Sequence, residues 1–344
     1  MKKFDFIIGN PPYQESYEGE SKGANSIYNY FMDETYKIAN KVELITPARF
    51  LFNAGSTPKA WNKKMLEDEH LKVLFYERAA SKVFPNVDIK GGVAVTYRDG
   101  GSKFGKIGVF IEEDELRSIA KKVNDFNDFI SLTQIIITSF AYHFTEKMHE
   151  DHPEAKDMMS KGHAYDLKSS SFERLPQIFL DEPKDDGCEY IKILGRENNQ
   201  RCYKYVQRDY INKVSNLDKY KLFLPKANGM GVFGEVISSP SVEGPGTGAT
   251  ETFLSIGSFS TKKEATYVEK YIKTKFTRAL LGILKATQDI TPEKWKYVPL
   301  QDFSSSSDID WSKSISEIDK QLYKKYKLSK EEIEFIESHV KEME

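Results

Sequence analysis

The sequence has few of the residues that crosslink proteins or bind metals. Only two of the 344 residues are cysteines, and Cys188 and Cys202 lie fourteen positions apart without a CxxC pair. Two reduced thiols are therefore a better interpretation than a disulfide or a zinc site. The six histidines form no HExxH or comparable pattern, so we also expect no metal site.

Long apolar runs are missing as well. No segment approaches the roughly eighteen uninterrupted apolar residues that indicate a membrane helix. The first residues, MKKFDFIIGNPPYQ, have a basic start but too few apolar residues for a signal peptide. We therefore expect a cytoplasmic protein without membrane contact, and the length suits two or three globular domains.

Charge is nearly balanced overall but unevenly distributed. The net charge is −2, yet residues 196–226 hold eight Lys or Arg against three Asp or Glu, and residues 262–296 hold nine against four. Such basic stretches are expected where a surface follows a phosphate backbone. A charged helix face is more often only a solvated face, so the charge alone does not decide between the two.

Strands and helices alternate in the first hundred residues. Short apolar runs bounded by Gly and Pro indicate strands, and apolar residues at helical spacing indicate helices between them. This alternation predicts βαβ units and a largely parallel sheet. The predicted strands span residues 4–8, 42–45, 71–75 and 92–97, and the predicted helices span residues 26–40 and 58–69.

The remainder of the chain changes character twice. Residues 112–151 look mainly helical, with Ile135–Ile137 among the core positions, and residues 153–183 form a looser connector. Beyond Cys188, short strands alternate with Gly and Pro turns.

Two capping boxes mark helices near the end of the chain. Thr261 with Glu264 predicts the start of one helix that continues to Leu284, and Ser329 with Glu332 predicts the start of the last helix. The last helix belongs to a charged tail that follows a serine-rich link.

The segment with the clearest chemistry is the strand expected at residues 4–8 and the loop Asn10-Pro11-Pro12-Tyr13 that follows it. Such a loop lies at the carboxyl end of its strand, where parallel α/β sheets bind ligands. Two prolines stiffen the loop and leave its carbonyls free to accept. The Asn10 amide oxygen and the Pro11 carbonyl can then bind both hydrogens of an exocyclic amine, which makes the nitrogen lone pair available to attack an electrophilic methyl group.

Tyr13 adds an aromatic face on which a flipped-out base can stack. The alternative is that Asn-Pro-Pro-Tyr is only a tight turn. The apolar strand before the loop and the aromatic residue that ends it favour the chemical interpretation.

With these residues the sequence resembles the adenine-N6 DNA methyltransferases of type II restriction–modification systems, specifically the TaqI-like type, in which a strand and an NPPY loop form the catalytic motif. Residues 45–50, and residues 82–85 with 91–95, resemble the segments that follow. The resemblance implies that Tyr13 and Phe84 stack against the two faces of the flipped adenine. For Phe84, a Val-Phe-Pro turn that only packs in the core is the alternative.

The C-terminal half is similar to the target-recognition region of the same family, in stretches that include residues 220–229, 252–254, 284–288 and 298–300. The resemblance implies binding to double-stranded DNA. We predict the DNA contacts for basic residues near Tyr203 and Tyr205, without separating base contacts from phosphate contacts. These basic residues are Arg196, Arg201, Lys204, Arg208 and Lys226.

One part of the family pattern is missing. Related enzymes of this order place the elements that bind the methyl donor S-adenosylmethionine (AdoMet) before the catalytic loop, which here begins at residue 10. Residues 229–234 match G-x-G-x-x-G, but a proline-ended extended segment follows them instead of a helix. We interpret them as a loop of the recognition domain near DNA phosphates.

The missing part has a structural consequence. The strand at residues 4–8 would lack a neighbour and expose an apolar edge. We expect a partner chain or an upstream segment, carrying the AdoMet-binding motif, to cover this edge.

Together these features predict an α/β fold with a partial Rossmann-like methyltransferase sheet, then a helical connector and an α+β target-recognition domain. The expected function is transfer of a methyl group from AdoMet to the N6 amine of adenine in a specific DNA sequence, for which this chain supplies the flipped-base pocket and DNA recognition. The alternative is a non-catalytic DNA-binding specificity subunit or an inactive methyltransferase remnant. The expected domains are the catalytic half at residues 1–110, the connector at 111–183, the recognition domain at 184–303 and a helical tail at 304–344.

Overall fold

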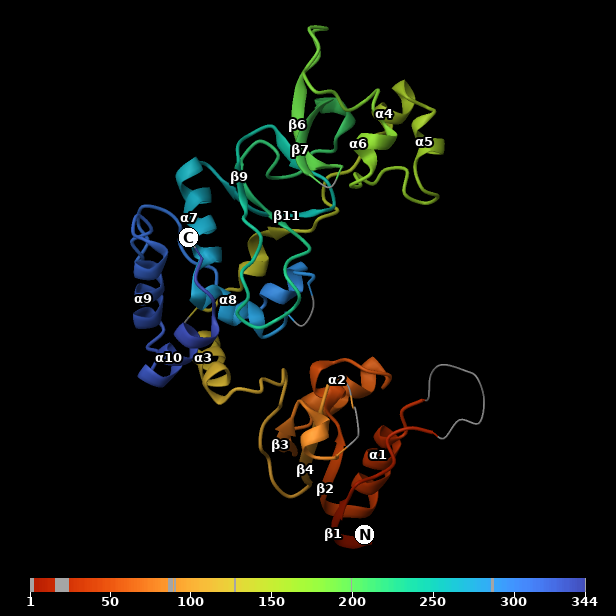
Figure 1. Cartoon of the computed structure of the whole chain (residues 1–344), viewed down its shortest axis with the longest axis vertical. Helices are drawn as coiled ribbons and strands as arrows, with labels where there is room; N and C mark the ends of the chain where they lie inside the picture. Colours follow the sequence, from red (N-terminus) through yellow and green to blue (C-terminus); the bar gives the residue numbers. More distant parts are fainter. Residues whose placement is uncertain are drawn as a thin grey trace. The chain divides into compact units, whose positions relative to one another are not determined.

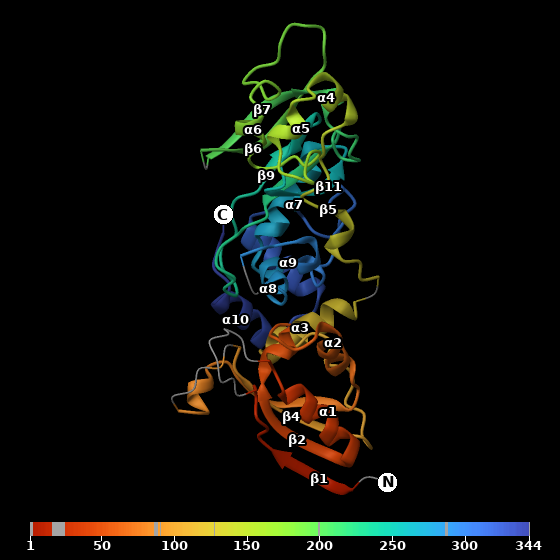
Figure 2. The same ribbon diagram turned by 90° about the vertical axis from the view of Figure 1, so that its right-hand side faces the viewer.

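The computed structural model describes residues 3–15, 25–85, 89, 91–126, 128–198, 200–285 and 288–343. The chain forms two compact units, an N-terminal unit of residues 1–112 and a C-terminal unit of residues 113–344. Both combine helices with sheets, so the predicted mixed α/β character is confirmed (Figures 1 and 2). No helix in the described ranges is long and apolar enough to cross a membrane.

The N-terminal unit is built on one four-stranded sheet. Its elements in chain order are β1 (Phe4–Gly9), α1 (Tyr28–Ile38), β2 (Ala39–Pro47), a 3₁₀ helix (Ala48–Phe52), α2 (Lys59–Glu67), β3 (Leu71–Glu77), a 3₁₀ turn (Ala80–Lys82) and β4 (Val93–Asp99). The strand order is β1-β2-β4-β3. β1 and β2 are parallel and joined by α1, which is the βαβ unit that the sequence predicts.

The prediction of a largely parallel sheet is wrong at β4, which runs antiparallel to both β2 and β3. In its described part, the connection from β3 to β4 holds a single 3₁₀ turn instead of the helix that normally returns a chain for parallel pairing. β1, β2 and β3 still run in one direction. Their carboxyl ends therefore share one edge of the sheet.

Helices α1 and α2 cover one face of this sheet. Tyr28 of α1 and Trp61 of α2 meet Phe50 of the 3₁₀ helix in the core, with ring centres 5.4–6.3 Å apart. Burying one such side chain contributes roughly 1.5–3 kcal/mol to folding. The opposite face, called the open face below, carries exposed apolar side chains. They include Phe6 (47% exposed), Ile8 (70%) and Phe75 (48%).

The C-terminal unit contains two sheets and most of the helices. Its strands are β5 (Ile136–Ile137), β6 (Tyr190–Glu197), β7 (Gln200–Gln207), β8 (Tyr220–Pro225), β9 (Ser241–Glu243), β10 (Thr247–Ala249) and β11 (Phe253–Phe259). Its α-helices are α3 (Asp114–Asn124), α4 (Glu146–Asp151), α5 (Ala155–Met158), α6 (Ser171–Arg174), α7 (Lys262–Lys273), α8 (Lys275–Gly282), α9 (Ile315–Lys325) and α10 (Lys330–His339). Short 3₁₀ helices span Leu132–Ile135, Arg208–Tyr210 and Pro292–Trp295.

One sheet of this unit has the order β10-β6-β7 and the other the order β5-β11-β8-β9. Helix α7 packs against β8, β9 and β11, and Figure 1 shows it beside α8 and α9. The C-terminal unit thus has a layer of helices against its larger sheet.

The end of the chain confirms some helix predictions and corrects others. Both capping boxes, at Thr261 and at Ser329, are formed. The single helix predicted from Thr261 to Leu284 is wrong, because Thr274 is extended and its hydroxyl caps a new helix, α8. Ile136 and Ile137 form β5 instead of helical core, since they pair with β11.

Candidate functional site

The Asn-Pro-Pro-Tyr loop leaves β1 at the carboxyl edge of the N-terminal sheet. The parallel register sets Gly9 beside Leu44 of β2, so the loop starts next to the last residues of that strand. Parallel α/β sheets bind their ligands at this edge. Asn10 and Pro12 are exposed there, and Pro11 is half-buried.

Tyr13 anchors this loop to the core. Its ring packs against the buried cluster beneath α1 and α2. Its carbonyl accepts the N–H of Ile27 at 3.1 Å, and Gln14 forms an antiparallel bridge with Ser26. The chain that enters α1 is therefore fixed to the residue that ends the loop.

Three buried polar atoms near this edge have no hydrogen-bond partner among the described residues: the Tyr13 hydroxyl, Asn29 Oδ1 and Thr46 Oγ1. Asn29 lies in the first turn of α1 and Thr46 near the end of β2, the two elements that flank the loop. Each unpaired buried polar atom costs roughly 1–3 kcal/mol, so the polar groups at this edge are incompletely satisfied among the described residues. Burial raises the pKa of the Tyr13 hydroxyl. The nearby Asn10 side chain partly opposes this rise, although the two side chains do not form a hydrogen bond of good geometry.

Sequence reasoning missed Asn29 and Thr46. Thr46 carried a usable signal, because it follows an apolar run and precedes a proline at the end of a parallel strand. Asn29 carried none, since its burial depends on how α1 packs.

Phe84 lies in the connection from β3 to β4, which starts from the same edge of the sheet. The residue is half-buried, and its N–H donates to the carbonyl of Ala80 at 2.8 Å. No ring contact joins Phe84 to Tyr13 among the aromatic pairs of the described residues. The structure thus places both residues in connections at one edge without bringing their rings together.

Gly92 ties the strand ends together at this edge. Its carbonyl accepts the N–H of Ala48 at 3.0 Å. Its φ is +79°, and a Cβ there would lie 2.3 Å from the carbonyl oxygen of Glu77. Only glycine fits this position, so the turn into β4 is fixed beside the ends of β2 and β3.

Three of the predicted DNA contacts, Arg196, Arg201 and Lys204, lie on the β6–β7 hairpin. Its register pairs Arg196 with Arg201 and Lys192 with Tyr205, so the four side chains share one face, called the hairpin face below. The Lys192 Nζ lies 5.7 Å from the centre of the Tyr205 ring. Sequence reasoning missed Lys192, because only the register places it beside the arginines.

Arg201 and Lys226 are held against aromatic rings. The Arg201 guanidinium lies 5.7 Å from the Phe253 ring centre and donates to the carbonyl of Ser239 at 3.0 Å. The Lys226 Nζ lies 5.4 Å from the ring centre of Phe140. These contacts hold the two cations in place, but neither the aromatic rings nor the carbonyl neutralises their positive charge.

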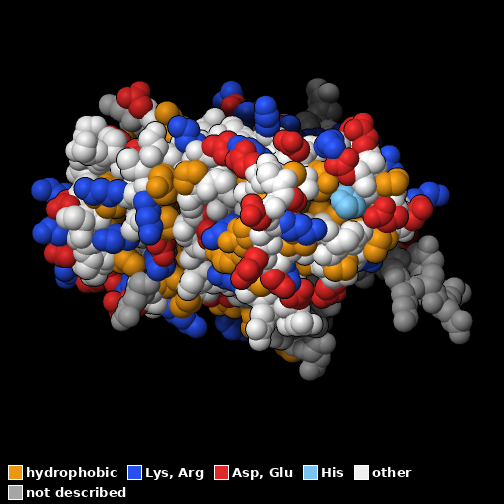
Figure 3. Space-filling view, turned by 90° about the horizontal axis from the view of Figure 1, so that it is seen from above, with side chains coloured by type: hydrophobic (Ala, Val, Ile, Leu, Met, Phe, Trp, Pro, Cys, Tyr) orange, Lys and Arg blue, Asp and Glu red, His pale blue; other side chains and the backbone are white. Residues whose placement is uncertain are grey.

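Lys204 and Arg208 are different, because acidic side chains neutralise them. Lys204 lies on the other face of the hairpin and pairs with Asp181 at 2.7 Å and Glu197 at 3.2 Å. Arg208 pairs with Asp218 and with a second carboxylate. Acidic side chains are also interspersed with Lys and Arg on the face shown in Figure 3. The five predicted cations therefore do not form one continuous basic surface.

The only G-x-G-x-x-G match does not fit a nucleotide-binding turn. An extended segment, and no helix, follows Gly234. The N–H groups of Met230 and Gly231 donate to the carboxylate of Glu235, at 2.8 and 2.9 Å, so they are not available to a ligand. Residues 229–234 therefore offer no AdoMet site.

The N-terminal segment is similar to known proteins. Residues 1–84 match the family model of the Eco57I restriction-modification methylase. A Mycoplasma pneumoniae protein described as an "uncharacterized adenine-specific methylase" is 31% identical over 96 residues, which are 27% of this chain and 23% of that protein. These matches confirm the resemblance to adenine methyltransferases of restriction–modification systems.

Among solved structures, the type IIG restriction endonuclease BpuSI matches 86% of this chain and 44% of its own chain, with 8% identity and a TM-score of 0.34. A superposition this loose carries no argument about fold or function. The chain spans less than a quarter of its curated relative and less than half of BpuSI.

Proposed function

We propose that this chain supplies the target-base half of a DNA adenine-N6 methyltransferase. One observation carries the proposal: Asn10-Pro11-Pro12-Tyr13 lies at the carboxyl end of β1, within the segment that matches a restriction-modification methylase family. The match to an adenine-specific methylase supports adenine as the target base. The fold that we infer for residues 1–110 is the corresponding part of a Rossmann-like methyltransferase sheet.

The chemistry assigned to the loop is polarisation of the target amine. The exposed Asn10 side chain and the Pro11 carbonyl accept the two N6 hydrogens of a flipped adenine. These hydrogen bonds draw the amine nitrogen toward tetrahedral geometry and make its lone pair available. Bound AdoMet would supply the methyl group: the new N–C bond would replace the C–S bond, S-adenosylhomocysteine would leave, and the amine proton would pass to solvent. Tyr13 and Phe84 are assigned to the two faces of the base, and Phe84 has to approach Tyr13 for this clamp to form.

Methyl transfer also requires AdoMet, and residues 229–234, which match G-x-G-x-x-G, do not fit an AdoMet-binding turn. We therefore propose that another polypeptide segment binds AdoMet and docks on β1. In the described part of the chain, β1 pairs only with β2, so its outer edge is unpaired. The neighbouring open face, with Phe6, Ile8 and Phe75, adds an exposed apolar surface of the kind that marks an interface.

The remaining assignments concern DNA. We propose that the hairpin face, with Lys192, Arg196 and Arg201, contacts double-stranded DNA, together with Lys226. We assign Lys204 and Arg208 a structural role, since carboxylates neutralise both. The connector, recognition domain and tail at residues 111–183, 184–303 and 304–344 complete the proposed organisation.

The test of the catalytic assignment is Asn10→Ala in the enzyme reconstituted with its AdoMet-binding segment. We expect loss of methylation by at least about a hundredfold, because the amine is no longer held and polarised, with DNA affinity changed less than about threefold. Arg201→Ala is the matched control, since it should weaken DNA binding and leave the chemistry of bound substrate intact. Equal loss of binding and methylation in Asn10→Ala would overturn the role of Asn10.

Calorimetric titration of AdoMet tests the proposed division of the active site. The titration is made with the chain alone and then with the polypeptide encoded directly upstream. Binding only in the second case supports a split active site. Binding in neither case, with DNA binding retained, would instead support a non-catalytic specificity subunit.

A further inference from the structure

The connection from β8 to β9 carries apolar side chains that point into solvent. Met230 and Val232, near its tip, are 82% and 56% exposed. Exposed apolar side chains on a mobile loop do not by themselves indicate a binding surface. Whether Met230 and Val232 mark one therefore depends on how rigidly the loop is held.

An internal carboxylate fixes the tip. Glu235 accepts the N–H groups of Met230 and Gly231, at 2.8 and 2.9 Å, and forms an ion pair with Lys285. Both charged side chains are largely buried. Gly229 has φ +58°, and a Cβ at this residue would lie 2.2 Å from the Glu235 carboxylate. The turn is thus closed around Glu235 and holds Met230 outward.

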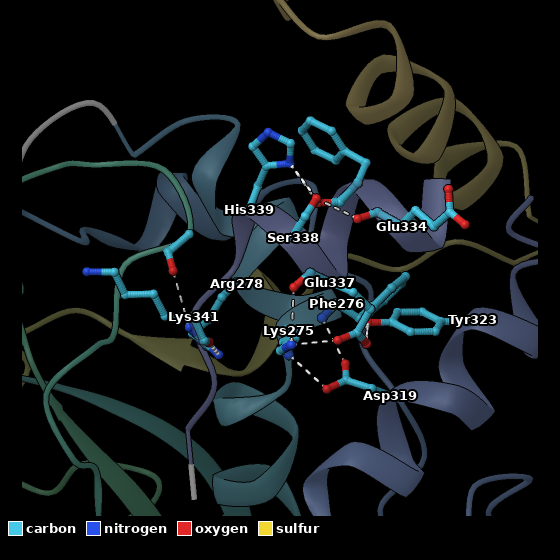
Figure 4. Close-up of polar contacts among 12 residues, drawn as sticks. Lys275, Phe276, Arg278, Asp319, Tyr323, Glu334, Glu337, Ser338, His339 and Lys341 are labelled. Atoms are coloured by element: carbon cyan, nitrogen blue, oxygen red, sulfur yellow. Dashed lines mark hydrogen bonds and ion pairs between the residues drawn. The ribbon is translucent and has the colours of Figure 1, made fainter. Parts of the chain in front are cut away.

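The base of the loop is anchored as firmly. The ring of Phe233 packs on Phe335 of α10, with 5.8 Å between ring centres. The carbonyl of Gly234 accepts the N–H of Lys341 at 2.9 Å. Arg278, which Figure 4 shows next to Lys341, donates to the carbonyl of Lys341. Phe233 therefore faces inward, while its neighbours on the tip remain in solvent.

The two ends of the connection meet cations of the proposed DNA-binding surface. Lys226 starts the connection directly after β8, and Arg201 of the hairpin face donates to the carbonyl of Ser239 at its other end. Along the chain the apolar tip thus lies between two cations, an order that suits a nucleic acid, in which phosphates flank an apolar base stack.

We propose that the loop formed by residues 229–235 is a wedge that inserts Met230 between base pairs of duplex DNA. The inference rests on the proposed function, which requires an adenine to leave the stack. Insertion of an apolar side chain unstacks a base step and stabilises the distorted duplex. Glu235 and Lys285 serve as positioning residues, because they hold the tip in place and do not touch DNA.

Photo-crosslinking of the full chain tests the wedge. The crosslinking amino acid p-benzoylphenylalanine is placed at position 230, or at position 158 as a control, because Met158 is an exposed methionine of the same unit. With a duplex of mixed sequence, we expect DNA crosslinks from position 230 at a yield at least about fivefold higher than from position 158, as befits direct contact with the bases.

A second measurement follows base stacking. A duplex that contains 2-aminopurine should brighten when the native chain binds, and Met230→Gln should reduce this response by at least about threefold, because the polar side chain no longer unstacks the bases. Met158→Gln should leave the response unchanged. DNA affinity should fall less in Met230→Gln than in Arg201→Ala.

Three outcomes would overturn the wedge: equal crosslinking yields at the two positions, crosslinks from position 230 to a second protein molecule instead of DNA, or an unchanged 2-aminopurine response in Met230→Gln. In each case retained DNA binding would leave the proposed function standing. Failure of the native chain to bind DNA at all would overturn both.

Discussion

The two four-stranded sheets of this protein differ in how much of their apolar surface is covered. In the C-terminal sheet, Phe223 and Ile256 are fully buried, and α7 packs on the strands that carry them. In the N-terminal sheet, α1 and α2 cover one face, while Phe6 and Ile8 remain exposed on the other.

The strands that carry these residues look alike in sequence. Phe4-Asp5-Phe6-Ile7-Ile8 is as apolar as Phe253-Leu254-Ser255-Ile256, yet only the second is covered on both sides. The difference shows that the larger sheet of the C-terminal unit buries its own apolar strands. The N-terminal sheet has an apolar face and an edge that a further segment could still bury.

The largest expected effect is a difference between matched truncations in the two sheets. Phe223→Ala should lower the free energy of unfolding by about 3–5 kcal/mol, because it removes a fully buried ring and leaves a cavity. Phe75→Ala, on the open face, should lower it by less than about 1 kcal/mol. Urea denaturation monitored by circular dichroism measures both.

Equal losses in these two variants would break the comparison, because Phe75 would then be buried in the free chain. Phe50→Ala serves as the internal control. Phe50 is buried on the covered face of the N-terminal sheet, so its truncation should cost about as much as Phe223→Ala.

The C-terminal unit also buries the carboxylate of Asp319, and the protonation of this group should affect stability. Asp319 of α9 accepts the N–H groups of Lys275 and Phe276, at 3.0 and 2.9 Å, at the start of α8 (Figure 4). Burial, with a smaller contribution from Glu337, raises its pKa from 3.8 to about 6, although the two N–H groups and Arg278 oppose the rise.

A raised carboxyl pKa means that the folded state holds a proton that the unfolded state has lost. The contribution of Asp319 to stability should therefore be largest below about pH 4 and decrease by up to about 3 kcal/mol as the pH rises to about 6. Asp319→Asn should remove this dependence. The readout is the difference between native and variant unfolding free energies from pH 4 to about pH 7, and a constant difference would contradict the prediction.

The local elements were largely predictable from the sequence, and the interactions between distant segments were not. The strand Phe4–Gly9, the helix Tyr28–Ile38 and both capping boxes depend on short-range patterns, and each forms. The antiparallel course of β4 and the strand at Ile136–Ile137 depend on partners far away in the chain, so periodicity could not reveal them.

The same distinction between local and long-range features applies to the candidate site. Asn10 to Tyr13 could be located because a strand and a loop motif are contiguous in the sequence. The burial of Asn29 and Thr46 and the alignment of Lys192 with the arginines require the packed structure. The neutralisation of Lys204 by Asp181 and Glu197 also depends on residues that only the fold brings together.

A third, smaller effect separates cations that look equivalent in the sequence. Arg201→Ala should weaken binding to duplex DNA by about fivefold and reduce the salt dependence by about one counterion, because a cation of the hairpin face is lost. Lys204→Ala should change the affinity by less than about twofold, since two carboxylates already neutralise this lysine. Fluorescence anisotropy over a salt series measures both, and equal losses would remove the distinction between the two faces of the hairpin.

The smallest effect on stability is expected at Ile8. Ile8→Thr keeps the β-branched shape that suits a strand and removes apolar surface that is already 70% exposed. The free energy of unfolding of the chain alone should therefore change by less than about 0.5 kcal/mol. Sedimentation of the chain mixed with the polypeptide encoded directly upstream should show weaker association, because the open face has lost an apolar contact. A loss of stability above about 1.5 kcal/mol would mean that Ile8 is buried in the free chain. The N-terminal sheet would then be closed like the C-terminal one, and the case for a segment that docks on β1 would be lost with it.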